Sequence, residues 1–352
     1  MALSEVPQCQ PGEDFDFLCV NDFLTNMVAA QALKSALALR LIDQLGAEQP
    51  STLARLEPTW RGDRRGLRLL LDLLAANQVV ERIGDEIRLT PRFRGALRFR
   101  DLLEAKLDFA NLVAPDLIQF FPWLFVDPDR FMQKARIFNL FDYSRCLEPS
   151  PENYEATKRW MRFTTCLTRY EAPACMRLHD FSRYARMLDV GGNSGEFILR
   201  VCKKHPGLRG TVFDLPVVCD IGREHVRREP EAPRIDFVKG SALVDPLPTG
   251  FDLITFKSML HDWSNDDATR ILTRASQFRD AGGTLLIFER APIEVGTASV
   301  PYSMIPMLLF FRNFRSPLFY QERLKELGFE GVEIQTIHLE MPFFLVTARW
   351  GG

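Results

Sequence analysis

The sequence has no marked excess of charge of either sign and no long apolar run. Among its 352 residues, 44 are Lys or Arg and 46 are Asp or Glu, so the formal net charge is −2. This balance gives no electrostatic reason to expect binding to nucleic acid. The longest apolar run, at 304–311, contains Pro306 and is too short to cross a bilayer. The first residues lack the basic-then-apolar order of a signal peptide.

Paired cysteines and paired histidines are also missing. The seven cysteines are odd in number and form no CxxC pair, which favours reduced thiols and a cytoplasmic protein. The five histidines are scattered, and none pairs with another at the spacing of metal ligands. The sequence therefore predicts neither a disulfide framework nor a metal site.

The first half of the chain is predicted to be helical apart from one small hairpin. Three helices followed by a hairpin are typical of a winged helix. Prolines between 115 and 151 are expected to break the next stretch into short helices, before a long helix from about 151 to 170. The elements expected earlier are helical spacing over 17–45, a helix at 52–56 capped by Ser51, a helix at 67–78, and two strands at 79–91 about Gly84.

From residue 185 on, strand-like runs alternate with helical segments or loops. This alternation predicts a doubly wound, Rossmann-like α/β sheet. Only the residues 338–342, which include LEMP, separate the last two runs. This is too short for a parallel crossover and predicts an antiparallel hairpin. We therefore expect a helical domain at 1–170 and an α/β domain at 171–352. The strand-like runs are 185–190, 210–214, 235–240, 251–256, 284–289, 332–337 and 343–348.

A glycine-rich turn, MLDVGGNSGEF at 187–197, follows the first of these strands. Glycines after a buried strand let the backbone approach a ligand. The turn does not fit the dinucleotide pattern GxGxxG, and Asp189 stands two residues before the first glycine. An acid there would repel a pyrophosphate but suits a cationic ligand. On this motif alone, an ordinary turn of an α/β sheet remains an equal alternative.

A second acid, Asp214, ends the next strand, twenty-five residues after Asp189. At this place in such sheets a carboxylate accepts hydrogen bonds from the two hydroxyls of a ribose. S-adenosylmethionine (SAM) carries a ribose and a positive charge but no phosphate. The sequence thus predicts SAM as cofactor and S-adenosylhomocysteine as its product.

With these motifs, the chain resembles the class I SAM-dependent methyltransferases, and specifically the dimeric small-molecule O-methyltransferases of plants and bacteria. The resemblance covers essentially the whole chain. It implies that the winged-helix-like half serves for dimerisation and that the acceptor is a small molecule. The matching segments are 187–197, 212–216, 256–272, 282–289 and 319–329. The cofactor residues it implies are Asp189, Gly191, Gly192, Asn193, Gly195, Asp214, Leu215, Ser241 and Lys257.

Two of these cofactor residues depart from the family pattern. Asn193 stands where the family usually has a third consecutive glycine, and Ser241 stands where it commonly has Asp. Asn tolerates left-handed backbone angles better than most residues, so the turn is expected to survive. Ser241 keeps a hydrogen-bonding group but removes a charge. We therefore expect SAM to bind.

His261 and Glu289 are the candidate catalytic residues. Both follow or end a predicted strand at the carboxyl edge of the sheet, where ligands bind. A neutral histidine can remove the proton of a hydroxyl acceptor, and a carboxylate on its far ring nitrogen fixes the tautomer. In the family the histidine of this HDW motif is the base, and the acid matching Glu289 is one of two that flank it. The alternatives are a histidine that ties down its loop and an acid that caps a helix.

The second flanking acid of the family falls near Phe314, but no Asp or Glu lies between Tyr302 and Tyr320. Arg312 and Arg315 occupy this segment. They suggest a clamp for an acceptor carboxylate, with surface arginines as the alternative. The other candidates for the acceptor wall are Tyr143, Trp160, Met161, Phe163 and Met304.

The sequence accordingly predicts a SAM-dependent methyltransferase that acts on a hydroxyl, with His261 as the general base. One alternative is S-methylation of a small anionic thioether resembling methylthiohydroxybutyrate. Another is a winged-helix DNA-binding regulator, which the mostly apolar helix at 67–78 disfavours. A catalytically dead relative is disfavoured because both His261 and Glu289 are present. We expect a homodimer, because 15–45 carries more apolar residues than one helix face needs, and no nucleic-acid or membrane partner.

Overall fold

The computed structural model describes residues 27–277, 283–292, 309, 313–339 and 341–350. The chain divides into two compact units, Met1–Leu107 and Asp108–Gly352. The division falls within helix α6 (Arg100–Val126), whereas the sequence analysis placed it at 170/171. That position lies inside the continuous helix α8 (Pro151–Leu178), whose buried side chains pack within the second unit.

The first unit contains the helices and the hairpin that the sequence predicts, and its three-stranded sheet has the order β1-β3-β2. A hydrophobic core that includes Leu41, Leu67 and Leu71 joins the helices to the sheet. The winged-helix designation itself stays a prediction. The elements are α1 (Met27–Ala38), α2 (Leu41–Ala47), β1 (Ser51–Thr52), α3 (Leu53–Leu56), α4 (Arg64–Ala76), β2 (Val80–Ile83), β3 (Glu86–Leu89), α5 (Pro91–Ala96) and η2 (Leu97–Phe99).

Two local expectations for this unit need correction. The described part of the predicted helix 17–45 is two helices, because Arg40 adopts a left-handed φ of 61° between them. The expected cap of α3 by Ser51 is wrong: Ser51 lies in β1 and pairs with Ile87, and Thr52 precedes the helix without a side-chain bond.

The prediction that prolines from 115 on break this stretch into short helices is wrong for Pro115 and Pro122. Helix α6 extends for 27 residues through Pro115 and Pro122. An interior proline removes one backbone hydrogen bond, but the helix packs Phe109, Val113 and Leu124 into a hydrophobic core, which stabilises it. Among the described residues, the helical stretch 91–126 is long and apolar enough to cross a membrane by length and composition alone. The elements before α8 are α7 (Pro128–Lys134), η3 (Arg136–Phe141) and η4 (Tyr143–Cys146).

The second unit is built on a seven-stranded sheet of order β6-β5-β4-β7-β8-β10-β9. Strand β10 runs antiparallel to both of its neighbours, and the pairs from β6 to β8 are parallel. The predicted doubly wound sheet and its antiparallel end are therefore confirmed. The strands are β4 (Arg186–Val190), β5 (Arg209–Asp214), β6 (Ile235–Lys239), β7 (Leu253–Lys257), β8 (Thr284–Arg290), β9 (Phe329–His338) and β10 (Pro342–Trp350).

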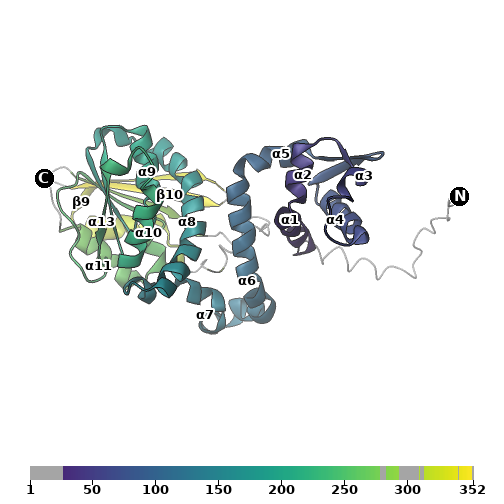
Figure 1. Ribbon diagram of the computed structural model, residues 1–352. Helices are drawn as coiled ribbons and strands as arrows, with labels where there is room; N and C mark the ends of the chain where they lie inside the picture. Colours follow the sequence, from purple (N-terminus) through teal and green to yellow (C-terminus); the bar gives the residue numbers. More distant parts are fainter. Residues whose placement is uncertain (1–26, 278–282, 293–308, 310–312, 340, 351–352) are drawn as a thin grey trace, which may run out of the picture. The chain divides into compact units, whose positions relative to one another are not determined.

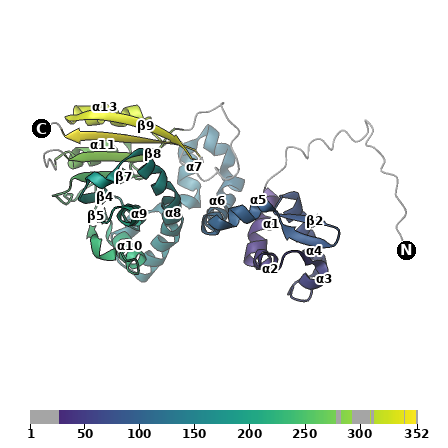
Figure 2. The same ribbon diagram turned by 90° about the horizontal axis from the view of Figure 1, so that it is seen from above.

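Alternate residues of these strands enter two separate cores, one on each face of the sheet. Met187 and Leu286 pack with α8 and its neighbours α9 and α10, whereas Leu188 and Leu285 pack with α11 and α13. Figures 1 and 2 show α8, α9 and α10 gathered on one side of the sheet. The helical elements of this part are η5 (Phe181–Arg183), α9 (Glu196–Lys204), α10 (Pro216–Val226), η6 (Ala232–Arg234), η7 (Leu260–Asp262), α11 (Asn265–Ala275) and α13 (Pro317–Glu326).

Candidate active site

A cavity opens within the second unit at the carboxyl ends of the parallel strands, the edge where open α/β sheets bind ligands. One part of its wall comes from the ends of β4, β5, β6 and β7, and another part is aromatic. The first part includes Gly191, Asn193, Asp214, Leu215, Ser241 and Lys257; the second includes Phe109, Phe141, Tyr143, Trp160, Phe163, Trp263 and Phe314.

The glycine-rich turn after β4 has the backbone shape that its sequence predicts. Gly191, Asn193 and Gly195 all have positive φ, at 68°, 55° and 74°. A side chain at Gly191 would place a Cβ only 2.3 Å from Cγ of Met259, so only glycine fits there. Asn193 tolerates its left-handed angle, and its Oδ1 accepts a hydrogen bond of 2.8 Å from the N–H of Ser194. The turn thus survives without a third consecutive glycine.

Asp214 fixes this turn to the end of β5. Its two carboxylate oxygens accept hydrogen bonds from the N–H groups of Asn193, at 2.8 Å, and Leu215, at 2.7 Å. Burial raises the pKa of Asp214 to about 6, although these two N–H groups lower it. The carboxylate lines the cavity, so its remaining lone pairs are available to ligand hydroxyls.

Asp189 lies beneath the turn and does not line the cavity. Its Oδ1 accepts a bond of 2.6 Å from the hydroxyl of Thr255, while Oδ2 is buried without a hydrogen-bond partner among the described residues. Burial raises the pKa of Asp189 to about 7. Of these two acids, Asp214 lines the cavity, where its carboxylate fits the hydroxyls of a ligand such as SAM.

The other predicted cofactor residues fall into two groups. Ser241 and Lys257 line the cavity. Lys257 donates 2.9 Å to the hydroxyl of Thr168 and also pairs with buried Glu171. Gly192 and Gly195 lie behind the wall, where Gly195 precedes the first turn of α9. Their contribution is to the shape of the turn.

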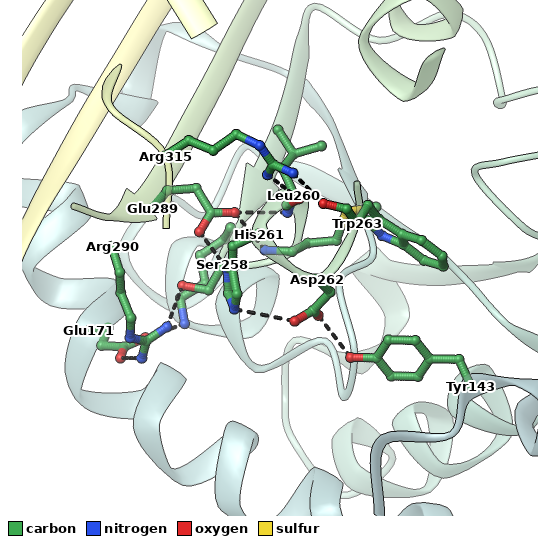
Figure 3. Close-up of polar contacts among 12 residues, drawn as sticks. Tyr143, Glu171, Ser258, Leu260, His261, Asp262, Trp263, Glu289, Arg290 and Arg315 are labelled. Carbon is green, nitrogen blue, oxygen red and sulfur yellow. Dashed lines mark hydrogen bonds and ion pairs between the residues drawn. The ribbon is translucent and has the colours of Figure 1, made fainter. Parts of the chain in front are cut away.

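His261 and Glu289 come together as predicted (Figure 3). Oε2 of Glu289 lies 2.7 Å from Nδ1 of His261, and Oε1 accepts bonds of 2.8 Å from the N–H groups of Met259 and Leu260. Glu289 is 1% exposed. Because an ionised carboxylate only accepts hydrogen bonds, this contact places the proton of a neutral ring on Nδ1 and leaves a lone pair on Nε2.

The pKa values of this pair move in opposite directions. Burial lowers the pKa of His261, but the negative charges of Glu289 and Asp262 outweigh it, so the pKa is raised above its ordinary value. Burial raises the pKa of Glu289, but the His261 charge and the hydrogen bonds it accepts outweigh that, so its pKa is lowered. A histidine paired in this way is suited to accept a proton.

Phe314 occupies the place where the resemblance implies a second acid. Its ring packs edge-on against His261, with centroids 5.3 Å apart. Asp262, which the sequence analysis passed over, is the acid that contacts the other ring nitrogen: its Oδ1 lies 3.3 Å from Nε2. The hydroxyl of Tyr143 donates a bond of 2.8 Å to its Oδ2. The HDW motif could have predicted this acid, because Asp262 directly follows His261 in the sequence.

Arg315 was expected to line the cavity as part of a carboxylate clamp, but it does not. Its Nη1 donates 2.9 Å to the carbonyl of Leu260, Nη2 donates to the carbonyl of Trp263, and Nε donates 2.5 Å to Oδ1 of Asn265. Glu289 thus holds N–H groups of the His261 loop, and Arg315 holds its carbonyls (Figure 3). Arg312 and Met304 lie outside the described residues.

Some of the remaining acceptor candidates line the cavity and one does not. Tyr143, Trp160 and Phe163 line the cavity, whereas Met161 is buried in a core with Cys146 and Val217. Arg290, the residue after Glu289, is a further site residue that was not predicted from the sequence. Arg290 lines the cavity, pairs with Glu171 and donates 3.1 Å to the hydroxyl of Ser258.

The fold and the cavity define a SAM-dependent methyltransferase of the Rossmann-like type. A profile of the O-methyltransferase domain family matches residues 139–330, more than half of the chain. The chain belongs to this family.

Several relatives support this assignment. The mitomycin biosynthesis 6-O-methyltransferase of Streptomyces lavendulae is 28% identical over 297 residues, which cover 82% of each chain. The 3-hydroxy-5-methyl-1-naphthoate 3-O-methyltransferase of Streptomyces sahachiroi is 31% identical over 167 residues, or 46% of this chain and about half (48%) of that relative.

Solved structures agree at the level of the whole chain. Mitomycin 7-O-methyltransferase superposes with a TM-score of 0.72 at 25% identity, covering 96% of this chain and 98% of the other. Human N-acetylserotonin methyltransferase in complex with SAM has a TM-score of 0.70 at 21% identity, with all of both chains covered. This second likeness shows the fold.

Proposed function

We propose that this protein transfers the methyl group of SAM to a hydroxyl on an aromatic small molecule, with His261 as the general base. The observation that carries the proposal is the contact of 2.7 Å between Glu289 and Nδ1 of His261. It directs the lone pair of Nε2 away from Glu289, and His261 belongs to the wall of an aromatic cavity.

Different residues of the cavity bind the cofactor and remove the acceptor proton. When bound, SAM supplies a methyl group on a sulfonium, which is already activated for transfer. Asp214 and the turn at 191–195 hold the ribose and the adjacent chain. Nε2 of His261 takes the proton of the acceptor hydroxyl, and Glu289 stabilises the imidazolium that forms. The aromatic side chains exclude water from the reacting groups.

The aromatic wall favours a flat, largely apolar acceptor. Phe109 and Phe163 stack with centroids 4.2 Å apart, and Tyr143 and Trp160 meet at 5.7 Å. The named acceptor of one relative is a hydroxynaphthoate, which has this character. The described cationic side chains of the wall, Lys257 and Arg290, are both paired with Glu171, so the anionic thioether alternative gains no support from them.

The proposal is tested by assaying transfer from methyl-labelled SAM to a set of naphthols and hydroxynaphthoates. His261→Ala is expected to lower kcat by about a hundredfold or more, since it removes the base, while SAM affinity measured by calorimetry stays unchanged. Wild-type turnover in His261→Ala would contradict the role of His261. Transfer only to thioethers would favour S-methylation.

We also propose that the protein is a cytoplasmic homodimer. The five described cysteines are all free thiols, which supports a reducing compartment. Leu33, Leu37 and Leu41, from the segment 15–45, are buried in the core of their own unit and are not free for a dimer interface. Exposed apolar residues lie on α6 and α7 instead: Leu112, Ile118, Phe121, Phe125, Val126 and Met132.

Light scattering with size-exclusion chromatography tests the dimer. The wild type is expected at twice the chain mass, and the double variant Ile118→Glu/Phe125→Glu at the monomer mass, because charges at an apolar interface oppose association. Leu69→Glu, an exposed residue of α4, is the control and should not change the mass. A monomeric wild type that sediments with lipid vesicles would instead assign this face to a membrane.

A further inference from the structure

Two carboxylates, from different elements, contact the ring of His261. Glu289 ends β8 and lies 2.7 Å from Nδ1, whereas Asp262 belongs to η7 and places Oδ1 3.3 Å from Nε2. The side chain of Asp262 is 26% exposed and that of His261 13% exposed, so both lie at the cavity but are largely shielded from solvent. The imidazole is thus flanked by one acid at each nitrogen.

The identities of these atoms constrain where protons reside. Glu289 accepts at Nδ1, so in the neutral ring Nε2 carries only a lone pair. An ionised Asp262 also carries only lone pairs, and two such atoms do not attract each other without a proton between them. The arrangement therefore matches the state that follows proton abstraction, in which the imidazolium donates from both nitrogens.

Tyr143 determines which way Asp262 faces. Its hydroxyl donates a hydrogen bond of 2.8 Å to Oδ2 of Asp262, and its ring contacts those of Trp160 and Trp263, at centroid distances of 5.7 and 5.9 Å. Burial and the charge of Asp262 hold the pKa of Tyr143 well above its ordinary value, so it remains a donor at neutral pH. A hydrogen bond donated to one oxygen favours the ionised carboxylate and leaves the other oxygen toward Nε2.

We propose that Asp262, oriented by Tyr143, is the second carboxylate that flanks the catalytic base. It takes the role of the acid that the family has near position 314, where this chain has Phe314. Both are positioning residues, because they act through His261. The hydroxyl proton of the acceptor moves to Nε2, its oxygen bonds to the methyl carbon as the carbon–sulfur bond breaks, and the electron pair of that bond stays on sulfur. Asp262 stabilises the positive ring until the proton leaves to solvent. This catalytic role rests on the proposed function, whereas the effect of Asp262 on the pKa of His261 does not.

Other charged groups surround the ring of His261. Burial raises the pKa of Asp262, and the positive charge of His261 opposes this shift. Arg290 lowers the pKa of His261, but it is paired with Glu171. The described ionisable groups near the ring or its loop are Glu289 and Arg290 on β8, Asp262 on η7, Tyr143 on η4, Asp214 on β5, Lys257 on β7, Glu171 on α8, Arg315 just before α13 and Tyr320 on α13.

The test measures the pKa of His261 directly, by NMR titration of the protein with labelled histidine rings and bound S-adenosylhomocysteine. His261→Ala assigns the signal. Asp262→Asn keeps the shape of the side chain and removes its charge, and should lower the pKa of His261 by about one unit or more. Tyr143→Phe should lower it by less, and the matched surface variant Asp266→Asn should leave it unchanged.

An unchanged His261 pKa in Asp262→Asn would overturn the proposal, as would a shift of equal size in Asp266→Asn. If Asp262→Asn does not fold, Tyr143→Phe decides in the same way. In the methyl transfer assay with a naphthol, the acid limb of kcat/KM should move to lower pH in Asp262→Asn while the plateau falls about tenfold. Absence of turnover on any hydroxyl would refute the proposed function, and the titration would still test the contact.

Discussion

The two parts of the cavity wall are built in different ways. On the cofactor side, Asn193, Asp214 and Ser241 each lie within three residues of the end of a parallel strand, and hydrogen bonds to the main chain fix the turn. On the acceptor side, the wall combines side chains from α6, η3, η4, α8, the loop after β7 and the segment before α13. Local sequence determines the first side, and packing between distant segments determines the second.

This difference implies that cofactor binding and acceptor chemistry can be separated by mutation. Changes to the carboxylates at strand ends should affect SAM affinity. Changes around His261 should affect turnover while SAM affinity persists. The following three variants test this separation, in order of decreasing effect.

Glu289→Gln is expected to have the largest effect. A glutamine amide can still accept the N–H groups of Met259 and Leu260, but its NH₂ group would face Nδ1 and favour the wrong tautomer of His261. In the Ser-His-Asp triad, exchange of the carboxylate for its amide, Asp→Asn, costs about 10⁴-fold in kcat. We expect a loss of about 10²–10⁴-fold in kcat, with SAM affinity unchanged.

The double variant His261→Ala/Glu289→Gln sharpens this test. Because both residues act as one unit, it should be no slower than His261→Ala alone. Multiplicative losses would show that Glu289 has a separate function. Weakened SAM binding in Glu289→Gln would show that the two sides of the cavity are not independent.

Asp214→Ala should affect the cofactor side alone. It removes hydrogen bonds between ligand hydroxyls and a charged group, worth about 1.5–3 kcal/mol, or roughly 10–150-fold in affinity. Calorimetry with SAM measures the loss. Asp220→Ala, an acid of α10 that pairs with Lys239 on the surface, is the control. Equal affinity in Asp214→Ala and the wild type would refute the assignment of the ribose site.

The cofactor side was predictable because each of its motifs spans only a few consecutive residues. Gly191, Asn193 and Asp214 fall at strand ends, and the alternation of strands and helices places those ends on one edge. The positions of His261 and Glu289 followed from the same rule. Ser264 caps α11 through an equally local contact, since its Oγ accepts a hydrogen bond from the N–H of Asp267 at 3.1 Å.

The acceptor side was not predictable from such rules. Tyr143 reaches Asp262 across 119 residues of sequence, and no periodicity encodes that contact. The second acid was sought near Phe314, by counting from α13, although it directly follows the base. Arg315 resembled a ligand clamp because its carbonyl partners, on the loop some 50 residues earlier, leave no trace in composition.

Arg315→Ala is the last and smallest of the three tests. Loss of the bonds to Leu260 and Trp263 should loosen the loop that carries His261 and lower kcat about tenfold, since small displacements of a catalytic group cost rate. Arg315→Lys should recover little of this loss, because an ammonium lacks the planar fork that reaches several carbonyls. Arg270→Ala, a surface arginine of α11 paired with Asp267, should behave as the wild type.

Neutral naphthols and anionic hydroxynaphthoates distinguish support of the loop by Arg315 from a carboxylate clamp. If Arg315 supports the loop, kcat falls equally for both kinds of acceptor and the acceptor KM changes little. A rise in KM for hydroxynaphthoates alone would restore the carboxylate clamp and show that Arg315 leaves the loop when an anionic acceptor binds.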